Sequence, residues 1–258
     1  MIFKHEPQSW IELQDYVKRI FVNCGYQAES PKIIETARSQ KLEVDVFAEI
    51  DGVPKQTIIC ECKNWNVNIP QAIVHSFRMQ VNDSGANLGL LISKKGFQPS
   101  AIEAARFSNV RLLTWSEFEK MYEMTWYKNY FISNLRTLLS PLIEYTEPIN
   151  SRVFRKADLL SEDKQKRFNE LRIQYERPTN LISELCFRAN LCTDLKTGFQ
   201  ADKTPLELPL SKNSIFLENR CFPASILNSS SYENVLSELT AFILEAIAAF
   251  DDLFGERA

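Results

Sequence analysis

The stretch LEVDVFAEIDGVPKQTIICECK, residues 42–63, joins two β-rich runs through a turn. Polar and apolar residues alternate over residues 42–50, which is the pattern of a half-buried strand. Residues 57–63 form the second β-rich run, and Gly52 lies in the turn between the two. We therefore expect a β-hairpin over residues 42–63, with the two strands paired side by side.

Charged side chains interrupt this apolar hairpin near one end. Glu61 and Lys63 alternate with buried-type residues, so both project from the same face of the second strand. Asp45 lies on the partner strand, where its carboxylate can meet Glu61 across the pair. Two carboxylates this close repel each other unless a cation lies between them, so the pattern predicts a cation site.

The tripeptide of an acid, any residue and lysine is not by itself evidence of a cation site, because it occurs three times in this chain. Residues 162–164 lie in a polar helical stretch and residues 194–196 in a predicted loop. Only Glu61-Cys62-Lys63 ends an apolar strand, and only this copy has an acid on the neighbouring strand. The strand position and Asp45 therefore carry the inference.

A divalent cation gives these side chains a chemistry. We expect Asp45, Glu61 and the backbone carbonyl of Cys62 to bind Mg²⁺, for which Mn²⁺ can substitute. Lys63 would orient or deprotonate an attacking water, so the group suits hydrolysis of a phosphodiester. Glu12 is a candidate outer carboxylate that orients a water at the metal, and a solvated helix face explains it equally well.

The same residues have plainer explanations. Glu61 and Lys63 can be a fortuitous ion pair on an exposed sheet edge, or the domain can have kept its fold and lost its activity. Glu43 is better explained as a salt-bridged edge residue than as a second acid of the site. Lys94 and Lys95 follow a predicted strand, where phosphate contact and simple solvation are evenly matched.

The flanking segments predict an α/β fold. A helix is expected over residues 10–24, with Ser9 as its N-cap and Gly25 as its stop. A second helix is expected from Gln71, followed by a buried strand at residues 88–93. A third helix is expected to begin near Pro99 and to lead into a last strand at residues 110–115. The order αββαβαβ favours a central mixed sheet flanked by helices.

The rest of the chain is predicted to be mainly helical. An aromatic stripe at helical spacing runs from Phe118 towards Pro141 and is read as helix packing or a dimer seam. Residues 161–192 are helical in pattern with a break at Pro178, and residues 197–229 read as irregular. A capping box at residues 230–233 precedes a final helix. We expect two domains, 1–120 and 121–258.

Composition restricts the remaining possibilities. The chain has 258 residues, a net charge of −3 and no apolar run long enough to span a bilayer, so we expect a cytoplasmic protein without membrane contact. Its six cysteines and two histidines show no zinc spacing, and we read the cysteines as reduced and mostly buried. With seven glycines and no phosphate-binding or nucleophile-elbow motif, nucleotide-driven and acyl-transfer enzymes are excluded as strong alternatives.

The residues also resemble a known family. Asp45 followed after a hairpin by Glu61-Cys62-Lys63 looks like the PD-(D/E)xK nuclease superfamily, although Val44 stands where the motif has its proline. Within it, residues 10–115 are similar to Mrr-like restriction endonucleases. The likeness lies in NCGY (23–26), ECKNW (61–65), SGANLGLLIS (84–93) and KGFQPSAIEAA (95–105).

That resemblance implies a restriction-endonuclease-like fold and metal-dependent cleavage of DNA, with Asp45, Glu61 and Lys63 as the catalytic residues. It also implies an assisting polar residue on the helix after the lysine strand, for which Gln71 and His75 are both candidates. We expect an endonuclease acting on double-stranded DNA in restriction or anti-phage defence. Its C-terminal half would recognise a target, a trigger, a protein partner or a second subunit of a homodimer. The alternative is an inactive nuclease-fold module for binding or assembly.

Overall fold

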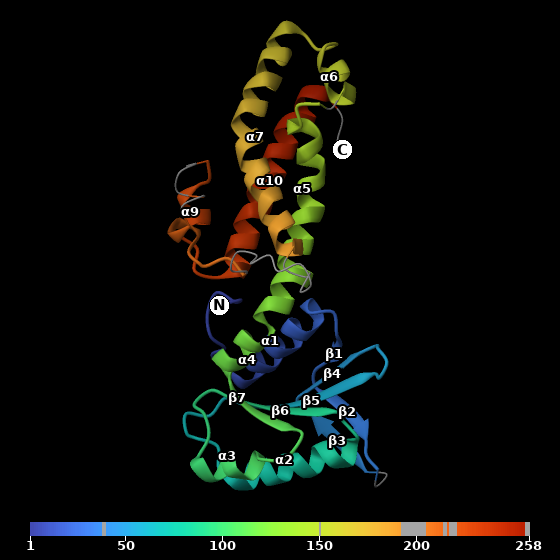
Figure 1. The fold of residues 1–258 in the computed structure, drawn as a ribbon, viewed down its shortest axis with the longest axis vertical. Coiled ribbons are helices and arrows are strands. Elements are labelled where there is room, and N and C mark those ends of the chain that lie inside the picture. Colours follow the sequence, from blue (N-terminus) through green and yellow to red (C-terminus); the bar gives the residue numbers. More distant parts are fainter. Residues whose placement is uncertain (38–39, 150, 192–204, 214–215, 217–220, 256–258) are drawn as a thin grey trace. The chain divides into compact units, whose positions relative to one another are not determined.

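A computed structural model describes the chain except for residues 38–39, 150, 192–204, 214–215, 217–220 and 256–258 (Figure 1). The chain divides into two compact units, which are treated separately below. One unit is His5–Asn129, and the other joins Met1–Lys4 to Tyr130–Ala258. The boundary expected after residue 120 falls inside helix α4, Trp115–Trp126, and the first unit extends past it.

The first unit is built on a mixed sheet of five strands in the order β1-β4-β5-β6-β7. β1 and β4 are antiparallel, as are β4 and β5, whereas β6 runs parallel to both β5 and β7. β2 and β3 pair with each other in a separate two-stranded sheet. The strands are β1 Gln27–Glu29, β2 Lys32–Glu35, β3 Lys41–Val44, β4 Val46–Ile50, β5 Gln56–Lys63, β6 Leu88–Ser93 and β7 Val110–Thr114.

Helices cover both faces of this sheet (Figure 1). α2 (Gln71–Ser84) and α3 (Pro99–Ala105) lie on one face, where Phe77 and Val81 pack against Ile59 and Leu91. α1 (Trp10–Asn23) and α4 lie on the other face, and the rings of Phe21, Phe118 and Tyr122 pack edge to face between them. The predicted α/β fold, a mixed sheet flanked by helices, is therefore confirmed, and Phe118 and Tyr122 of the aromatic stripe pack between helices as expected.

The strand expected over residues 42–50 is wrong in one respect, because it is two strands. β3 ends at Val44, β4 begins at Val46, and Asp45 forms the corner between them. The expected order αββαβαβ also lacks β1 and β2. These strands have three and four residues, too few to show a periodic pattern.

Helix boundaries follow the capping signals closely. Ser9 caps α1 by accepting a hydrogen bond from the Glu12 amide, as its sequence position predicts. Thr114 and Glu117 form a capping box that starts α4 at Trp115, whereas the sequence pattern predicts Trp115 as the end of the preceding strand. Local hydrogen bonding at Thr114 thus outweighs the β propensity of Trp115.

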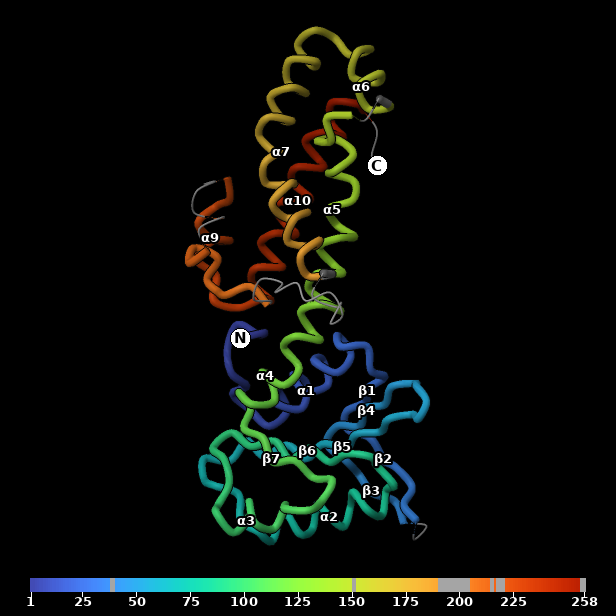
Figure 2. The backbone as a smooth tube through the Cα atoms, in the orientation of Figure 1, coloured from blue at the N-terminus to red at the C-terminus, as the bar shows by residue number. Residues whose placement is uncertain are grey.

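The second unit is helical, as expected. α5, α7 and α10 pack along one another (Figure 2), and the backbone carbonyls of Met1 and Ile2 accept the Tyr232 and Glu233 amides at 3.1 and 2.9 Å, which caps α10. The elements are a π-helix Tyr127–Ile132 that crosses the unit boundary, α5 Ser133–Thr146, α6 Ser151–Ala157, α7 Glu162–Leu191, a 3₁₀ turn Leu210–Lys212, α9 Ala224–Leu227 and α10 Tyr232–Phe254.

Two expectations for this unit need correction. α7 continues through Pro178 without the predicted break. α10 is capped by Ser231, which accepts from the Asn234 amide, and not by a box from Ser230 to Glu233. Much of the segment expected to be irregular, and Cys192 with it, lies outside the described residues. The other five cysteines are free, as expected.

No helix in the described part of the chain has the length and apolarity needed to cross a membrane.

The close packing of α2 on the sheet depends on Gly89 of β6. A Cβ atom at Gly89 would lie 2.4 Å from Val81 Cγ2 and 3.0 Å from Phe77 Cε1. We expect Gly89→Ala to lower the free energy of unfolding by about 1–3 kcal/mol, measured by urea denaturation. Gly52→Ala is the control, because its Cβ would meet only the Pro54 carbonyl at 3.4 Å. Equal stability of the two variants would contradict this account.

Candidate active site

Asp45 lies where one long antiparallel ribbon bends. The β1–β4 and β2–β3 pairs share one continuous register, which places Pro31 opposite Asp45. Proline has no amide hydrogen, so it cannot bond to the facing strand, and the ladder is interrupted there. The Ser30 hydroxyl donates to the Asp45 carbonyl at 2.7 Å and anchors the bend. Asp45 is thereby released from the backbone ladder.

The bend leaves the end of β5 open at one edge. The β4–β5 ladder ends at the pair Val46 and Cys60, and β3 turns away to pair with β2. The Cys62 amide, which another strand would otherwise accept, donates instead to Asp45 Oδ2 at 2.7 Å. The Asp45 side chain thus replaces a backbone acceptor, and this bond fixes its carboxylate against the end of β5.

Cys62 presents its carbonyl at the same edge. Within a strand, the N–H and C=O groups of one residue point to the same side, and the Cys62 N–H points to Asp45. The Cys62 thiol lies on the face of the sheet opposite to the side chains of Glu61 and Lys63, and it is fully buried. This burial raises the pKa of Cys62. Cys60 is buried on that same face, as its spacing predicted. The backbone oxygen of Cys62, and not its sulfur, is the available donor.

Glu61 and Lys63 form an ion pair at the end of β5. Their side chains are 20% and 19% exposed, so the pair is largely desolvated yet open to solvent. Burial raises the pKa of the Glu61 carboxyl, and the negative charge of Asp45 raises it further, while the hydrogen bond from Lys63 opposes both. The two carboxylates therefore lie close enough to repel each other.

The Lys63 ammonium also faces an aromatic ring. Its Nζ lies 5.8 Å from the ring centroid of Trp65, which is within range of a cation–π interaction. The sequence pattern gives Trp65 no role beyond the ECKNW likeness and gives Pro31 none. A tryptophan close to Lys63 was the signal available for Trp65. No local pattern marks Pro31, because it acts across the ribbon.

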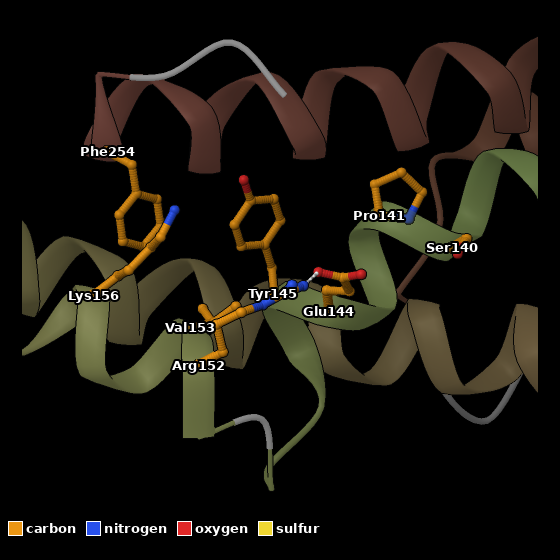
Figure 3. Close-up of a pocket in the computed structure, with 8 residues that line it drawn as sticks. All are labelled: Ser140, Pro141, Glu144, Tyr145, Arg152, Val153, Lys156 and Phe254. Carbon is orange, nitrogen blue, oxygen red and sulfur yellow. Dashed lines mark hydrogen bonds and ion pairs between the residues drawn. The ribbon is translucent and has the colours of Figure 1, made fainter.

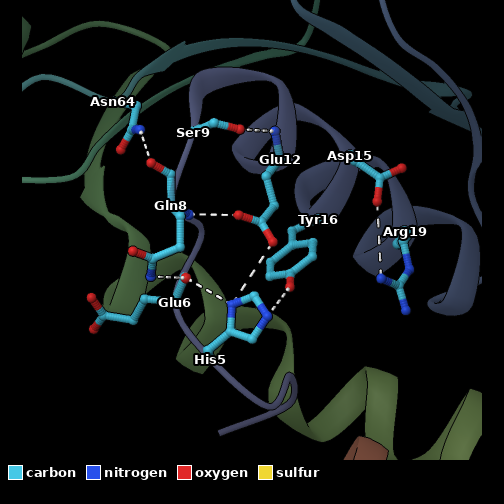
Figure 4. A network of polar contacts seen from close by, with 9 residues as sticks. All are labelled: His5, Glu6, Gln8, Ser9, Glu12, Asp15, Tyr16, Arg19 and Asn64. Atoms are coloured by element: carbon cyan, nitrogen blue, oxygen red, sulfur yellow. Dashed lines mark hydrogen bonds and ion pairs between the residues drawn. The ribbon is translucent and has the colours of Figure 1, made fainter.

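Glu12 lies in the first turn of α1 (Figure 4). Its Oε2 accepts the Gln8 amide at 2.6 Å, and its Oε1 lies 3.8 Å from His5 Nδ1. The hydrogen bond from Gln8 is the main reason that the pKa of Glu12 is lowered. The Asn64 amide donates to the Gln8 carbonyl at 3.2 Å, so this cap lies beside the residue that follows Lys63. The expected role of Glu12 at the metal stays a prediction, and its observed contacts are those of a helix cap.

The other candidates lie at the surface. Gln71 and His75 are exposed on the first turns of α2, and Glu43 is exposed on β3. Lys94 and Lys95 are exposed on the turn after β6. None of the hydrogen bonds or ion pairs described for the chain joins these side chains to Asp45 or Glu61.

The donor set fits a hard divalent cation. Asp45 and Glu61 supply carboxylate oxygens, Cys62 supplies a carbonyl, and the mutual repulsion of the two acids would be relieved by positive charge between them. Among the described residues no group of three or more Asp, Glu, His or Cys side chains is arranged to hold a metal. Mg²⁺ is commonly bound through one or two carboxylates with water in the remaining positions, so two acids suffice.

The helical unit contains a hollow of a different kind (Figure 3). It has a volume of about 400 Å³ and is lined by Ser140, Pro141, Glu144, Tyr145, Arg152, Val153, Lys156 and Phe254. Its polar groups join helices: Glu144 pairs with Arg152 of α6, and the Tyr145 hydroxyl donates to Asp251 of α10 at 2.6 Å. Tyr145 also stacks on Phe250. This arrangement is explained by packing.

Known proteins match part of this chain. A crystal structure of a protein of unknown function, AF1548, is similar with 21% identity and a TM-score of 0.37, over 42% of this chain and 58% of that one. No match is found among curated proteins. The restriction endonuclease family model Mrr_cat matches residues 6–122, which include Asp45, Glu61 and Lys63. Residues 6–122 of this chain therefore form a domain of the Mrr_cat restriction endonuclease family.

Proposed function

We propose that the protein is a Mg²⁺-dependent endonuclease that hydrolyses phosphodiester bonds in DNA, with Mn²⁺ able to replace Mg²⁺. The single observation that carries this proposal is the Asp45 carboxylate bonded to the Cys62 amide beside the Glu61–Lys63 pair. Membership of residues 6–122 in a restriction endonuclease family supports it.

In this proposal each residue has a distinct task. Asp45 and Glu61 hold the cation with the Cys62 carbonyl, and the Cys62 amide keeps Asp45 in place before substrate arrives. Bound Mg²⁺ supplies positive charge that lowers the pKa of water and offsets the charge developing on the phosphate. Lys63 orients the attacking water through its ammonium group, which the burial at the end of β5 keeps near Glu61.

The broader setting is also a proposal. We propose double-stranded DNA as the substrate, because that is what the family's description as restriction endonucleases suggests, with a cytoplasmic role in restriction or anti-phage defence. A homodimer would bring two sites to the two strands. The helical unit, residues 1–4 and 130–258, would recognise a partner protein or trigger.

A non-catalytic module is the competing possibility, and metal affinity separates the two. Isothermal titration calorimetry should detect Mg²⁺ or Mn²⁺ binding that is lost in Asp45→Ala and Glu61→Ala. Absence of binding that depends on these residues would favour an assembly module that keeps the fold.

Cleavage tests the proposed catalytic residues directly. With Mg²⁺, purified protein should nick or linearise supercoiled plasmid, and Asp45→Ala, Glu61→Ala and Lys63→Ala should each lower the rate at least about 100-fold. Each change removes a charged group from the site, whereas the fold is held by the apolar faces of the sheet.

Glu162→Ala is the matched control for cleavage, since Glu162 belongs to a second acid-x-lysine tripeptide at the exposed start of α7. It should cut like wild type. Wild-type protein that leaves DNA intact, or site variants that cut as fast as Glu162→Ala, would refute the assignment.

The raised pKa of Glu61 leads to a prediction for the metal-free protein. The folded state binds a proton at Glu61 more readily than the unfolded state, so ionisation of Glu61 costs stability once the pH exceeds its raised pKa. Glu61→Gln should therefore raise the Tm at pH 7–8, and the gain should shrink as the pH falls and wild-type Glu61 becomes protonated. Differential scanning calorimetry across pH measures both effects.

Metal should reverse the order of these stabilities. Added Mg²⁺ should raise the Tm of wild type more than that of Glu61→Gln, because binding to the native state stabilises it. Glu49→Gln is the control, as Glu49 lies on β4 and pairs with Lys55 at 2.9 Å. Glu49→Gln should show no gain in Tm at neutral pH, and added Mg²⁺ should raise its Tm as much as that of wild type. A Glu61→Gln protein less stable than wild type at every pH would contradict this reading.

A further inference from the structure

The loop that follows Lys63 is anchored at both ends. At its start, the Asn64 side chain donates to the Gln8 carbonyl at 3.2 Å. At its end, Ile69 is fully buried; its amide donates to the Gly96 carbonyl and its carbonyl accepts the Gln98 amide, both at 3.0 Å. The intervening residues are held in place without being buried themselves.

Trp65 is presented to solvent by this anchored loop. It is 41% exposed although it is a large aromatic side chain next to the proposed catalytic lysine. Such a ring offers a flat apolar face, and because its loop is already ordered, little conformational entropy is lost when a ligand binds to it. The position therefore suits contact with a planar group of the substrate.

Positive charge lies at the same end of the parallel strands β5 and β6. β5 and β6 run parallel with Lys63 beside Ser93, and the Lys94 amide donates to the Lys63 carbonyl at 3.1 Å. The buried Ser93 hydroxyl donates to the Gly96 carbonyl at 3.1 Å and accepts the Gly96 amide at 3.0 Å, which closes a tight turn. That turn exposes Lys94 and Lys95.

An aromatic face beside two lysines matches a single strand of nucleic acid, whose bases stack and whose phosphates attract cations. We propose that Trp65 stacks on an unpaired nucleobase of the substrate strand, with Lys94 and Lys95 against its phosphates. The faces of a paired base are covered by its neighbours, so a duplex substrate must first turn this base out of its stack, at a cost in free energy that a single strand does not bear. This inference rests on the proposed function, since it takes the substrate to be nucleic acid.

Binding without cleavage tests the proposal. Fluorescence anisotropy would use a fluorescein-labelled 20-nucleotide single strand and its duplex, with Ca²⁺ in place of Mg²⁺. Trp65→Ala should raise the Kd for the single strand by about 5- to 150-fold, the range expected for one stacked base, and should change the duplex Kd less. Trp65→Phe keeps an aromatic face and should retain most of the affinity.

Phe107→Ala is the matched control. Phe107 is also an exposed aromatic residue beside a cation, with Arg106 Cζ 5.4 Å from its ring centroid. It precedes β7, however, and so lies at the opposite end of the parallel strands. This variant should bind like wild type. Wild-type affinity of Trp65→Ala, an equal loss in Phe107→Ala, or an equal loss on single strand and duplex would each overturn the proposal.

Plasmid cleavage by the same preparations separates this inference from the function on which it rests. Protein that binds single strands through Trp65 but never cuts DNA would refute the nuclease assignment and leave the stacking intact. Protein that cuts DNA with no dependence of binding on Trp65 would refute the stacking alone.

Discussion

The hydrogen bond from the Cys62 amide to Asp45 Oδ2 is the constraint on which the candidate site depends. It forms only because the ribbon bends at Asp45 and withdraws β3 from the edge of β5. With a straight ribbon, Val44 would face Cys62 and a backbone carbonyl would take this amide. The bend thus converts a sheet edge into a place where a carboxylate, a carbonyl and the Glu61–Lys63 pair meet.

The site keeps like charges together at a cost to stability. Burial and the charge of Asp45 both raise the pKa of Glu61, and the ion pair with Lys63 relieves this only in part. In the proposed function, groups held in such a state would bind a cation without first having to be brought together. The apolar packing of α2, which requires Gly89, supplies the rigid support for this arrangement.

Sequence patterns predicted the elements with strong periodicity or clear caps. α1 with Ser9, β5, β6 and the final long helix all follow apolar spacing that one face of the core imposes. The patterns failed at two very short strands and at one proline inside a helix. β1 and β2 are too short to show a period, and α7 continues through Pro178 where a break was expected.

The sequence by itself determined the hairpin, the shared face of Glu61 and Lys63, and the likeness of residues 10–115 to Mrr-like endonucleases, because each depends on residues close together in the chain. Only the tertiary structure decided that Asp45 stands at a corner, where its carboxylate accepts the Cys62 amide. Only it placed Pro31 across from Asp45. Those relations depend on which strands pair and where the hydrogen-bonded ladder between them is interrupted. Contacts between different segments of the chain determine both, so the pattern within one segment does not show them.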